Sequence, residues 1–308
     1  MGRVAVIGDV GGHADQLRGA LLRLGAEGDG LRLPEGLTVI QVGDLVDRGP
    51  DSTGVLDLVG RYLEEQPDQW IQLAGNHEAQ YLPGGTPFWR ERLADGDARR
   101  LRAWWADGRL RIAAAVRTTA GDARGAGASQ RSTDGDARGA GASQRSTDGD
   151  DVLLTHAGLT VDAWRALGEP PTATAAARLL NERPEPLIWL GDGLTAGGVA
   201  GPLWAEAGWE LYEPWMHFYA AGGFVPFDQT HGHSSVVRFA ERMWRCPGRV
   251  RLRATVDWEA RHTRVRIGGR TFTGVDPKHG RTGAQRWQPL VLEGAQVQPV
   301  DRVGFGRR

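Results

Sequence analysis

Aspartate, asparagine and histidine residues recur in short glycine-containing motifs along this 308-residue chain. In order, the motifs are GDVGGH at 8–13, GDLVDRG at 43–49, GNHE at 75–78, THAG at 155–158 and THGHSS at 230–235. They hold five of the 8 histidines in the chain. Carboxylate, amide and imidazole groups are the ligands that divalent Mn, Fe and Zn take in proteins. The motifs therefore predict a metal site assembled from distant parts of the chain.

Hydrolysis of a phosphate ester at such a site needs three further features. Two cations about 3.5–4 Å apart must share a carboxylate, for which Asp44 is the natural candidate. An acid must protonate the leaving oxygen. An arginine can hold the phosphoryl oxygens with its planar guanidinium group. Because Asp47, Arg48 and His77 lie in the same motifs, the sequence favours a metal-dependent phosphoesterase.

Each of the first four motifs is preceded by, or lies at the end of, a predicted β-strand. Short apolar runs predict strands over Arg3–Ile7, Leu37–Val42, Trp70–Leu73 and Asp151–Leu154. Apolar spacing predicts a helix over Ala14–Leu24, and Asp51 can cap a second helix. Strands that alternate with helices indicate an α/β fold with parallel strand pairing. Loops at the carboxyl ends of such strands usually carry the functional residues.

The last third of the chain has a different pattern. Arg249–Val256, Thr263–Ile267 and Pro289–Leu292 alternate polar and apolar residues, as antiparallel strands with one solvated face do. We expect these strands, within residues 247–297, to form part of a second sheet packed on the first.

An insertion over residues 119–150 has low complexity. The sequence of Gly121–Asp134 is repeated identically as Gly135–Asp148, and it has no apolar periodicity. Long segments of this kind are usually either disordered or functional. We predict a disordered surface insertion, with a flexible lid or a partner tether as the alternative.

The five motifs, in this order, resemble those of the calcineurin-like metallophosphoesterases. Their DRG and NHE forms are most similar to the phosphoprotein phosphatase branch, which includes bacterial serine/threonine phosphatases and ApaH-like diadenosine polyphosphatases. The resemblance covers roughly Val4 to Ser234. It implies a single domain over residues 1–308, folded as a four-layer α/β/β/α metallophosphoesterase sandwich with two divalent metal ions between the sheets.

The resemblance also implies a role for each motif residue. His77 would be the general acid, oriented by Asp47, and Arg48 would bind the phosphate group. Asp9 would bind the first metal ion and Asp44 would bridge both ions. The ligands of the second ion would be Asn76, His156 and His233.

The first motif departs from the family pattern, because Gly11 stands where the family usually has histidine. We predict His13 as the replacement metal ligand, with His231 as a second candidate; otherwise His13 only begins the following helix. Ser235 occupies the position where some members carry another histidine. We identify no second phosphate-binding arginine. The segment FTGVDPKHGRTGA resembles a loop that borders the active site in the family, so His279 is a further candidate.

We predict hydrolysis of phosphomonoesters by a water molecule that the two ions activate, with Mn as the first choice of metal and Fe or Zn as alternatives. The expected substrates are phosphorylated serine and threonine in proteins. One alternative is a dinucleoside polyphosphate or another small phosphoester. A second alternative is a non-catalytic phosphate-binding module with a degenerate metal site.

The composition argues against several other classes of protein. Lys and Arg total 37 and Asp and Glu total 38, so the net charge of −1 gives no support to nucleic-acid or polybasic membrane binding. No apolar run approaches the ~18–20 residues that cross a bilayer. Cys246 is the only cysteine, which excludes an intrachain disulfide. With no leader-like N-terminus, we expect a cytoplasmic protein without nucleic-acid or membrane partners.

Overall fold

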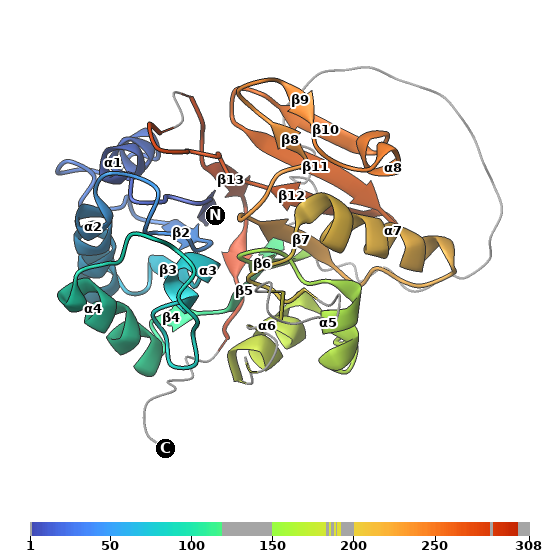
Figure 1. Ribbon diagram of the computed structural model, residues 1–308, viewed down its shortest axis with the longest axis horizontal. Coiled ribbons are helices and arrows are strands. Elements are labelled where there is room, and N and C mark those ends of the chain that lie inside the picture. The colour runs from blue at the N-terminus through green and yellow to red at the C-terminus, as the bar shows by residue number, and fades with distance from the viewer. Residues whose placement is uncertain are drawn as a thin grey trace.

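Two β-sheets pack face to face, and each carries helices on its outer surface (Figure 1). The computed structural model describes residues 2–118, 150–182, 185, 188, 190–191, 200–283 and 286–300. The first sheet has the order β13-β1-β2-β3-β4, and the second has the order β10-β11-β12-β7-β6-β5-β14. This arrangement is the predicted α/β fold, with helix, sheet, sheet and helix layers.

The strands of the first sheet are β1 (Arg3–Ile7), β2 (Leu37–Gln41), β3 (Trp70–Leu73), β4 (Leu110–Arg111) and β13 (Leu290–Glu293). Those of the second are β5 (Ala113–Thr118), β6 (Asp150–Thr155), β7 (Asp228–His231), β10 (Ala254–Asp257), β11 (His262–Ile267), β12 (Arg270–Gly274) and β14 (Gln296–Val297). A small ribbon pairs β8 (Val237–Arg238) with β9 (Met243–Trp244). In the first sheet β1 pairs parallel with β2, β2 with β3, and β3 with β4. In the second sheet β7 pairs parallel with both β6 and β12.

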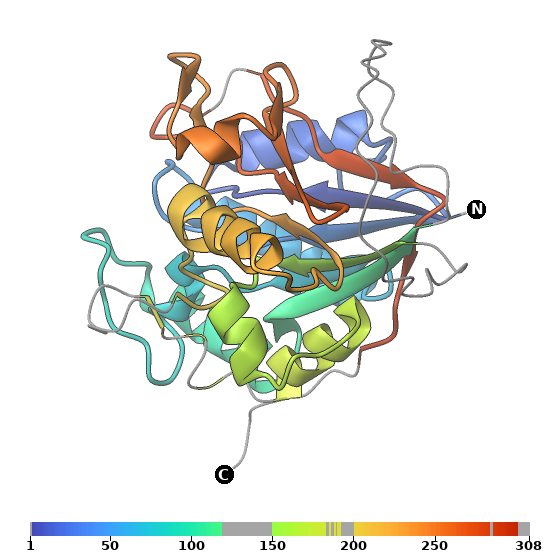
Figure 2. The ribbon, with the colours of Figure 1, turned by 90° about the vertical axis from the view of Figure 1, so that its right-hand side faces the viewer.

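The outer helices of the first sheet are α1 (Ala14–Arg23), α2 (Ser52–Glu65) and α4 (Asp95–Ala106). The second sheet is covered by α5 (Val161–Ala166), α6 (Ala173–Glu182) and α7 (Glu213–Ala220), which lie in front of its strands in Figure 2. The other helical segments are α3 (Asn76–Ala79), α8 (Gly248–Arg251) and a π-helix over Ala207–Tyr212. Among the helices that the structure describes, none is long and apolar enough to span a membrane.

The first two helices form as their sequences predict. Leu17 and Leu21 are fully buried on the inner face of α1. At the start of α2, the side chain of Asp51 accepts a hydrogen bond from the Gly54 backbone N at 2.8 Å. A hydrophobic core lies between the two sheets and includes Val6 of β1 and Leu154 of β6.

Two predictions for the C-terminal third are wrong. The strand expected over Pro289–Leu292 belongs to the first sheet, where β13 pairs antiparallel with β1. The strand expected over Arg249–Val256 begins only at Ala254, because α8 occupies its first residues. The strand expected over Thr263–Ile267 is confirmed as β11. Apart from Asp150 in β6, the insertion predicted over 119–150 lies outside the described residues.

His262, at the start of β11, makes the stability of this sheet depend on pH. Its ring is buried and its Nε2 donates to the Gln288 carbonyl O at 2.8 Å, and burial lowers the pKa of His262 to about 4. The unfolded chain, with a histidine pKa near 6.5, binds a proton that the folded protein excludes. Acidification from about pH 6.5 to 5 should therefore cost about 1.5 kcal/mol of unfolding free energy. Urea denaturation at both pH values should show that His262→Gln loses correspondingly less unfolding free energy on acidification than the wild type. An equal loss in the two proteins would contradict this role of His262.

Candidate metal centre and phosphate site

The candidate site lies where strands of the two sheets end together. β1, β2 and β3 of the first sheet and β6 and β7 of the second each run into one of the sequence motifs. The loops of β2 and β3 approach closely at their glycines. A Cβ on Gly43 would lie 2.5 Å from the Gly75 backbone N, and one on Gly75 would lie 2.3 Å from the Asp44 backbone N. Any side chain at these two positions would push the loops apart.

Asp44, His156 and His233 lie at the centre of the site. One ligand atom from each of them lies within 4.8 Å of the others. Asn76 joins this group, because its Oδ1 is 3.1 Å from His156 Nε2 and 3.2 Å from His233 Nδ1. The backbone N of His233 donates to Asp9 Oδ1 at 2.8 Å. The structure thus brings together five of the six residues that the sequence predicts as metal ligands.

The donor set fits divalent cations. His156 Nδ1 donates to the Val42 carbonyl O at 2.9 Å, which fixes the ring and directs Nε2 to within 3.2 Å of Asp44 Oδ1. Metal-binding histidines in proteins are oriented by hydrogen bonds of this kind. Asp9 Oδ2 is buried and accepts no hydrogen bond in the part of the chain that the structure describes. Carboxylate, amide and imidazole groups in this arrangement could hold the two cations.

Buried charges in the site shift one another's pKa values. Burial opposes the charge of Asp44, yet His156 and His77 hold the pKa of Asp44 well below its ordinary value. Burial also opposes a charge on His156, but Asp44 raises the pKa of His156 to about 9. Burial and the charges of Asp276 and Asp44 raise the pKa of Asp9 to about 7. Asp44 therefore stays ionised throughout the neutral range.

A histidine–aspartate pair lies beside these ligands. His77 Nδ1 donates to Asp47 Oδ2 at 2.7 Å, and both side chains are buried. The opposite ring nitrogen, Nε2, accepts a hydrogen bond from Arg48 Nη2 at 3.1 Å. Because Asp47 fixes the tautomer and the ring plane, Nε2 is the atom that can exchange a proton with a bound molecule.

Arg48 lies across the carboxylates of the site. Its Nη2 is 3.1 Å from Asp44 Oδ2, and its Nη1 is 3.6 Å from Asp9 Oδ2. About a quarter of the side chain is solvent-accessible, at 23%. A guanidinium group that faces both the solvent and the metal ligands is suited to bidentate contact with phosphoryl oxygens.

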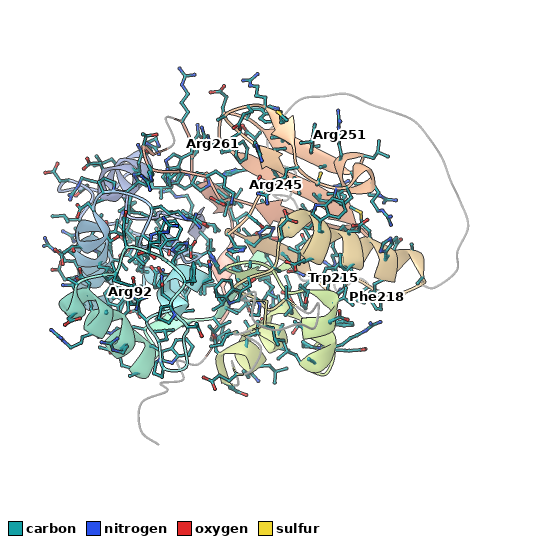
Figure 3. The ribbon with its side chains drawn as sticks, viewed as in Figure 1. Arg92, Trp215, Phe218, Arg245, Arg251 and Arg261 are labelled. Atoms are coloured by element: carbon teal, nitrogen blue, oxygen red, sulfur yellow. The ribbon has the colours of Figure 1, made fainter. Side chains whose placement is uncertain are left out.

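Gln80, which was not predicted as a site residue, connects the His77–Asp47 pair to the loop that contains Trp89. Its Nε2 donates to Asp47 Oδ2 at 2.8 Å. Its Oε1 accepts hydrogen bonds from the Trp89 backbone N at 3.2 Å and from Arg92 Nη1 at 3.0 Å; Arg92 is labelled in Figure 3. The same loop places Phe88 and Trp89 edge-on to the His77 ring, with centroids 5.1 and 4.8 Å away. The only signal in the sequence was a glutamine three residues after His77, close to one helical turn along the chain.

Glu78 supports the loop that carries Asp44, whose backbone has a positive φ of 57°. The buried Glu78 carboxylate accepts hydrogen bonds at 2.8 Å from the backbone N atoms of Asp44, Leu45 and Gly75. Glu78→Ala leaves these buried donors unsatisfied, and it should lower the free energy of unfolding by about 2–4 kcal/mol. The exposed Glu65 of α2 provides the control, because Glu65→Ala should change it by less than about 0.5 kcal/mol. Equal urea midpoints for the two variants would show that Glu78 does not support the loop.

The other candidate histidines are not among the ligand atoms that lie within 4.8 Å of one another. His13 Nε2 is hydrogen-bonded to the Gly280 carbonyl O at 2.8 Å, and its ring lies 5.1 Å from that of His279. Both ring nitrogens of His231 are also engaged, by the Tyr212 hydroxyl at 2.6 Å and by the Gly232 carbonyl O at 2.9 Å. The geometry therefore gives no support to His13 or His231 as a metal ligand.

Comparison with known families agrees with this geometry. The sequence profile of the calcineurin-like phosphoesterase family matches residues 2–192. The chain belongs to this family. This calcineurin-like phosphoesterase is therefore a hydrolase, and the family typically depends on two metal ions. No curated protein sequence matches the chain.

Several solved structures align with the chain at low sequence identity. A mutant of a cold-active protein tyrosine phosphatase aligns with a TM-score of 0.50 and 15% identity over 95% of this phosphoesterase and 76% of its own chain. A protein serine/threonine phosphatase from Saccharomyces cerevisiae aligns with a TM-score of 0.43 and 13% identity over 97% and 81% of the two chains. A structure provisionally described as a diadenosine tetraphosphatase aligns with a TM-score of 0.39 and 17% identity, over 98% of this phosphoesterase and 95% of its own chain.

Proposed function

We propose that this chain is a metal-dependent phosphomonoesterase that acts on phosphorylated serine and threonine side chains of proteins. The observation that carries the proposal is the position of His77 Nε2, 3.1 Å from Arg48 Nη2 and 3.8 Å from Asp44 Oδ2. These distances support the roles proposed for the three residues at one point of the site: proton donor, phosphate-binding group and metal ligand.

Each group has a distinct task in the reaction. Arg48 would bind two equatorial oxygens of the phosphoryl group and stabilise their negative charge. His77 would protonate the leaving oxygen from Nε2, while Asp47 keeps the ring in position. The ligands for the cations would be Asp9, Asp44, Asn76, His156 and His233. The chemistry that two bound cations supply is neutralisation of phosphoryl charge and a water molecule nucleophilic at neutral pH. We propose Mn as the activating metal, because the donors are oxygen and imidazole.

A dinucleoside polyphosphate is the second candidate substrate, and the aromatic residues near His77 favour it. Phe88 is 42% exposed, and its ring lies 5.2 Å from that of Trp204. Exposed aromatic rings next to a phosphate site can stack on a nucleobase, which contributes about 1–3 kcal/mol per base.

Product formation by chelator-treated protein, with and without added Mn(II), tests the function; the product measured is inorganic phosphate for the monoesters and free nucleotide for the dinucleotide. The substrates are p-nitrophenyl phosphate, phosphoserine and phosphothreonine peptides, a phosphotyrosine peptide and diadenosine tetraphosphate. We expect Mn-dependent hydrolysis, with the phosphoserine and phosphothreonine peptides preferred. Preference for the dinucleotide, lost in Phe88→Ala, would support the second candidate instead. No turnover by folded protein with any divalent metal would overturn both.

A further inference from the structure

The carboxylate of Asp47 depends on side-chain partners for its orientation. Asp47 lies in the loop between β2 and α2, outside any helix or strand, and its backbone has a positive φ of 66°. Its side chain is only 3% exposed. One oxygen, Oδ2, accepts two hydrogen bonds, from His77 Nδ1 at 2.7 Å and from Gln80 Nε2 at 2.8 Å. A displacement of Gln80 would therefore release the carboxylate that orients the His77 ring.

The buried amide of Gln80 has different partners at its two ends. Nε2 donates to Asp47 Oδ2 at 2.8 Å and to the His77 carbonyl O at 3.2 Å. Oε1 accepts from three donors, which are the backbone N atoms of Phe88 and Trp89 and the Nη1 of Arg92, at 3.4, 3.2 and 3.0 Å. The partners of Nε2 only accept and those of Oε1 only donate, so the amide has one orientation. Glutamine is suited to this position, because asparagine is one methylene shorter and an ionised glutamate has no donor for Asp47.

The three donors belong to the segment between α3 and α4, residues 81–94, which we call the aromatic loop. It contains no helix or strand, so its position depends on contacts such as those with Gln80. Its Phe88 and Trp89 rings lie edge-on to the His77 ring. Phe88 is largely accessible to solvent, so the leaving group of a substrate bound at His77 would lie against this loop. Gln80 thus connects the residues that would handle the proton with the loop that would contact the leaving group.

Gln69 shows what an amide with a purely structural role does in this fold. It precedes β3, at the opposite end of that strand from the site, and its Nε2 donates to the Pro34 and Leu37 carbonyl O atoms at 2.8 and 2.9 Å. These hydrogen bonds join backbone segments. Gln80 differs because it bonds the side chain of Asp47, so Gln69 is the matched control for the loss of amide hydrogen bonds.

We propose that Gln80 is a positioning residue for proton transfer, which fixes the Asp47–His77 pair relative to the aromatic loop. This inference rests on the proposed function, in which His77 acts from Nε2 on the leaving oxygen. A proton is needed most when the leaving oxygen is strongly basic. The contribution of Gln80 should therefore be large for a phosphoserine peptide and small for p-nitrophenyl phosphate.

Steady-state kinetics of Gln80→Met in the full chain test this role. Methionine keeps the length of the side chain and removes both sets of hydrogen bonds. With a phosphoserine peptide kcat should fall about 10–100-fold, as expected when a reacting group is misplaced, while KM and metal content stay unchanged. With p-nitrophenyl phosphate the fall should be less than about threefold. Gln69→Met should leave the ratio of the two rates unchanged.

The same substitution in the His77→Ala background gives the sharper test. A residue that acts through His77 has nothing left to position there, so Gln80→Met should change neither rate by more than about twofold. A further loss in this background would assign Gln80 to the general structure of the site and overturn the proposal. Equal losses on both substrates in the wild-type background would overturn it too, and a rise in KM with unchanged kcat would assign Gln80 to substrate binding instead.

Proton NMR tests the position of the ring without turnover. The His77 Nδ1 proton, which is donated to a buried carboxylate, should give a slowly exchanging low-field resonance that is missing in His77→Ala. In Gln80→Met its exchange with water should become several-fold faster, and an unchanged resonance would overturn the proposal. A wild type without metal-dependent turnover would overturn the proposed function, and NMR separates this failure from that of the positioning role.

Arg92→Met decides the question if Gln80→Met does not fold, as circular dichroism would show. Arg92 is exposed, and its hydrogen bond to Gln80 Oε1 is the shortest of the three and the only one with a charged donor. Its loss should lower kcat about 2–5-fold for the phosphoserine peptide, with no change for p-nitrophenyl phosphate. Unchanged rates on both substrates would overturn the proposal.

Discussion

Replacement of His77 by alanine should lower kcat by about 10²–10⁴-fold while the protein keeps its bound metal. His77 is hydrogen-bonded through Nδ1 to Asp47 at 2.7 Å, so the substitution removes a ring that Asp47 holds with Nε2 directed into the site. The loss should be larger for phosphoserine peptides than for p-nitrophenyl phosphate, because p-nitrophenolate leaves readily without a proton. Steady-state kinetics on both substrates, with metal analysis of the same samples, measures this difference.

The matched control is His217→Ala, which removes an exposed histidine from α7. It should leave kcat and metal content unchanged. Full activity in His77→Ala would exclude His77 as the general acid. An equal loss for both substrates would assign His77 a role in positioning Arg48, to which its Nε2 is hydrogen-bonded.

Local sequence patterns predicted the elements that position the site. β1 and β3 have the predicted bounds, and α1 ends within one residue of its prediction. Burial of apolar runs and a side-chain cap at Asp51 decide these elements over a few residues, so their signals are local. The convergence of Asp44 and Asn76 was predictable as well, because each follows a predicted strand and the carboxyl ends of parallel strands meet. His156 and His233 follow strands of the second sheet, and only the family resemblance placed them in the same site.

Long-range packing decided what the sequence could not predict. Alternation in β13 indicates a strand with one solvated face, but it does not say that β1 is the partner. The hydrogen bond between His13 and Gly280 joins residues 267 positions apart. Asp276 precedes a proline, and the Asp-Pro dipeptide is typical of an exposed turn. In the structure Asp276 is buried, because the loop that contains Gly8 packs against the neighbouring Val275. Such contacts leave no periodic signal.

Asp44→Asn should abolish metal-dependent turnover, with a loss of roughly 10³-fold or more in kcat/KM. The reason is that Asp44 is the ionised carboxylate within 4.8 Å of the His156 and His233 ligand atoms, and a neutral amide cannot bridge two cations. Metal ions contribute several kcal/mol of transition-state stabilisation, and each 1.4 kcal/mol is about tenfold in rate. Asparagine has nearly the same shape, so the loop should keep its packing against Glu78.

Thermal unfolding separates the loss of metal from a loss of fold. Mn(II) at about 100 times its dissociation constant should stabilise the wild type by about 2.7 kcal/mol and raise Tm, whereas Asp44→Asn should show little shift. Asp57→Asn, at an exposed carboxylate on α2, is the control that should respond like the wild type. In the metal-free protein Asp44 is the main cause of the raised pKa of His156, so the metal-free variant should have a neutral His156 at pH 7, measurable by NMR. A variant that retains the Mn-dependent rise in Tm, the turnover and a charged His156 would remove Asp44 from the centre of the site, and with it the basis for a bridged pair of cations.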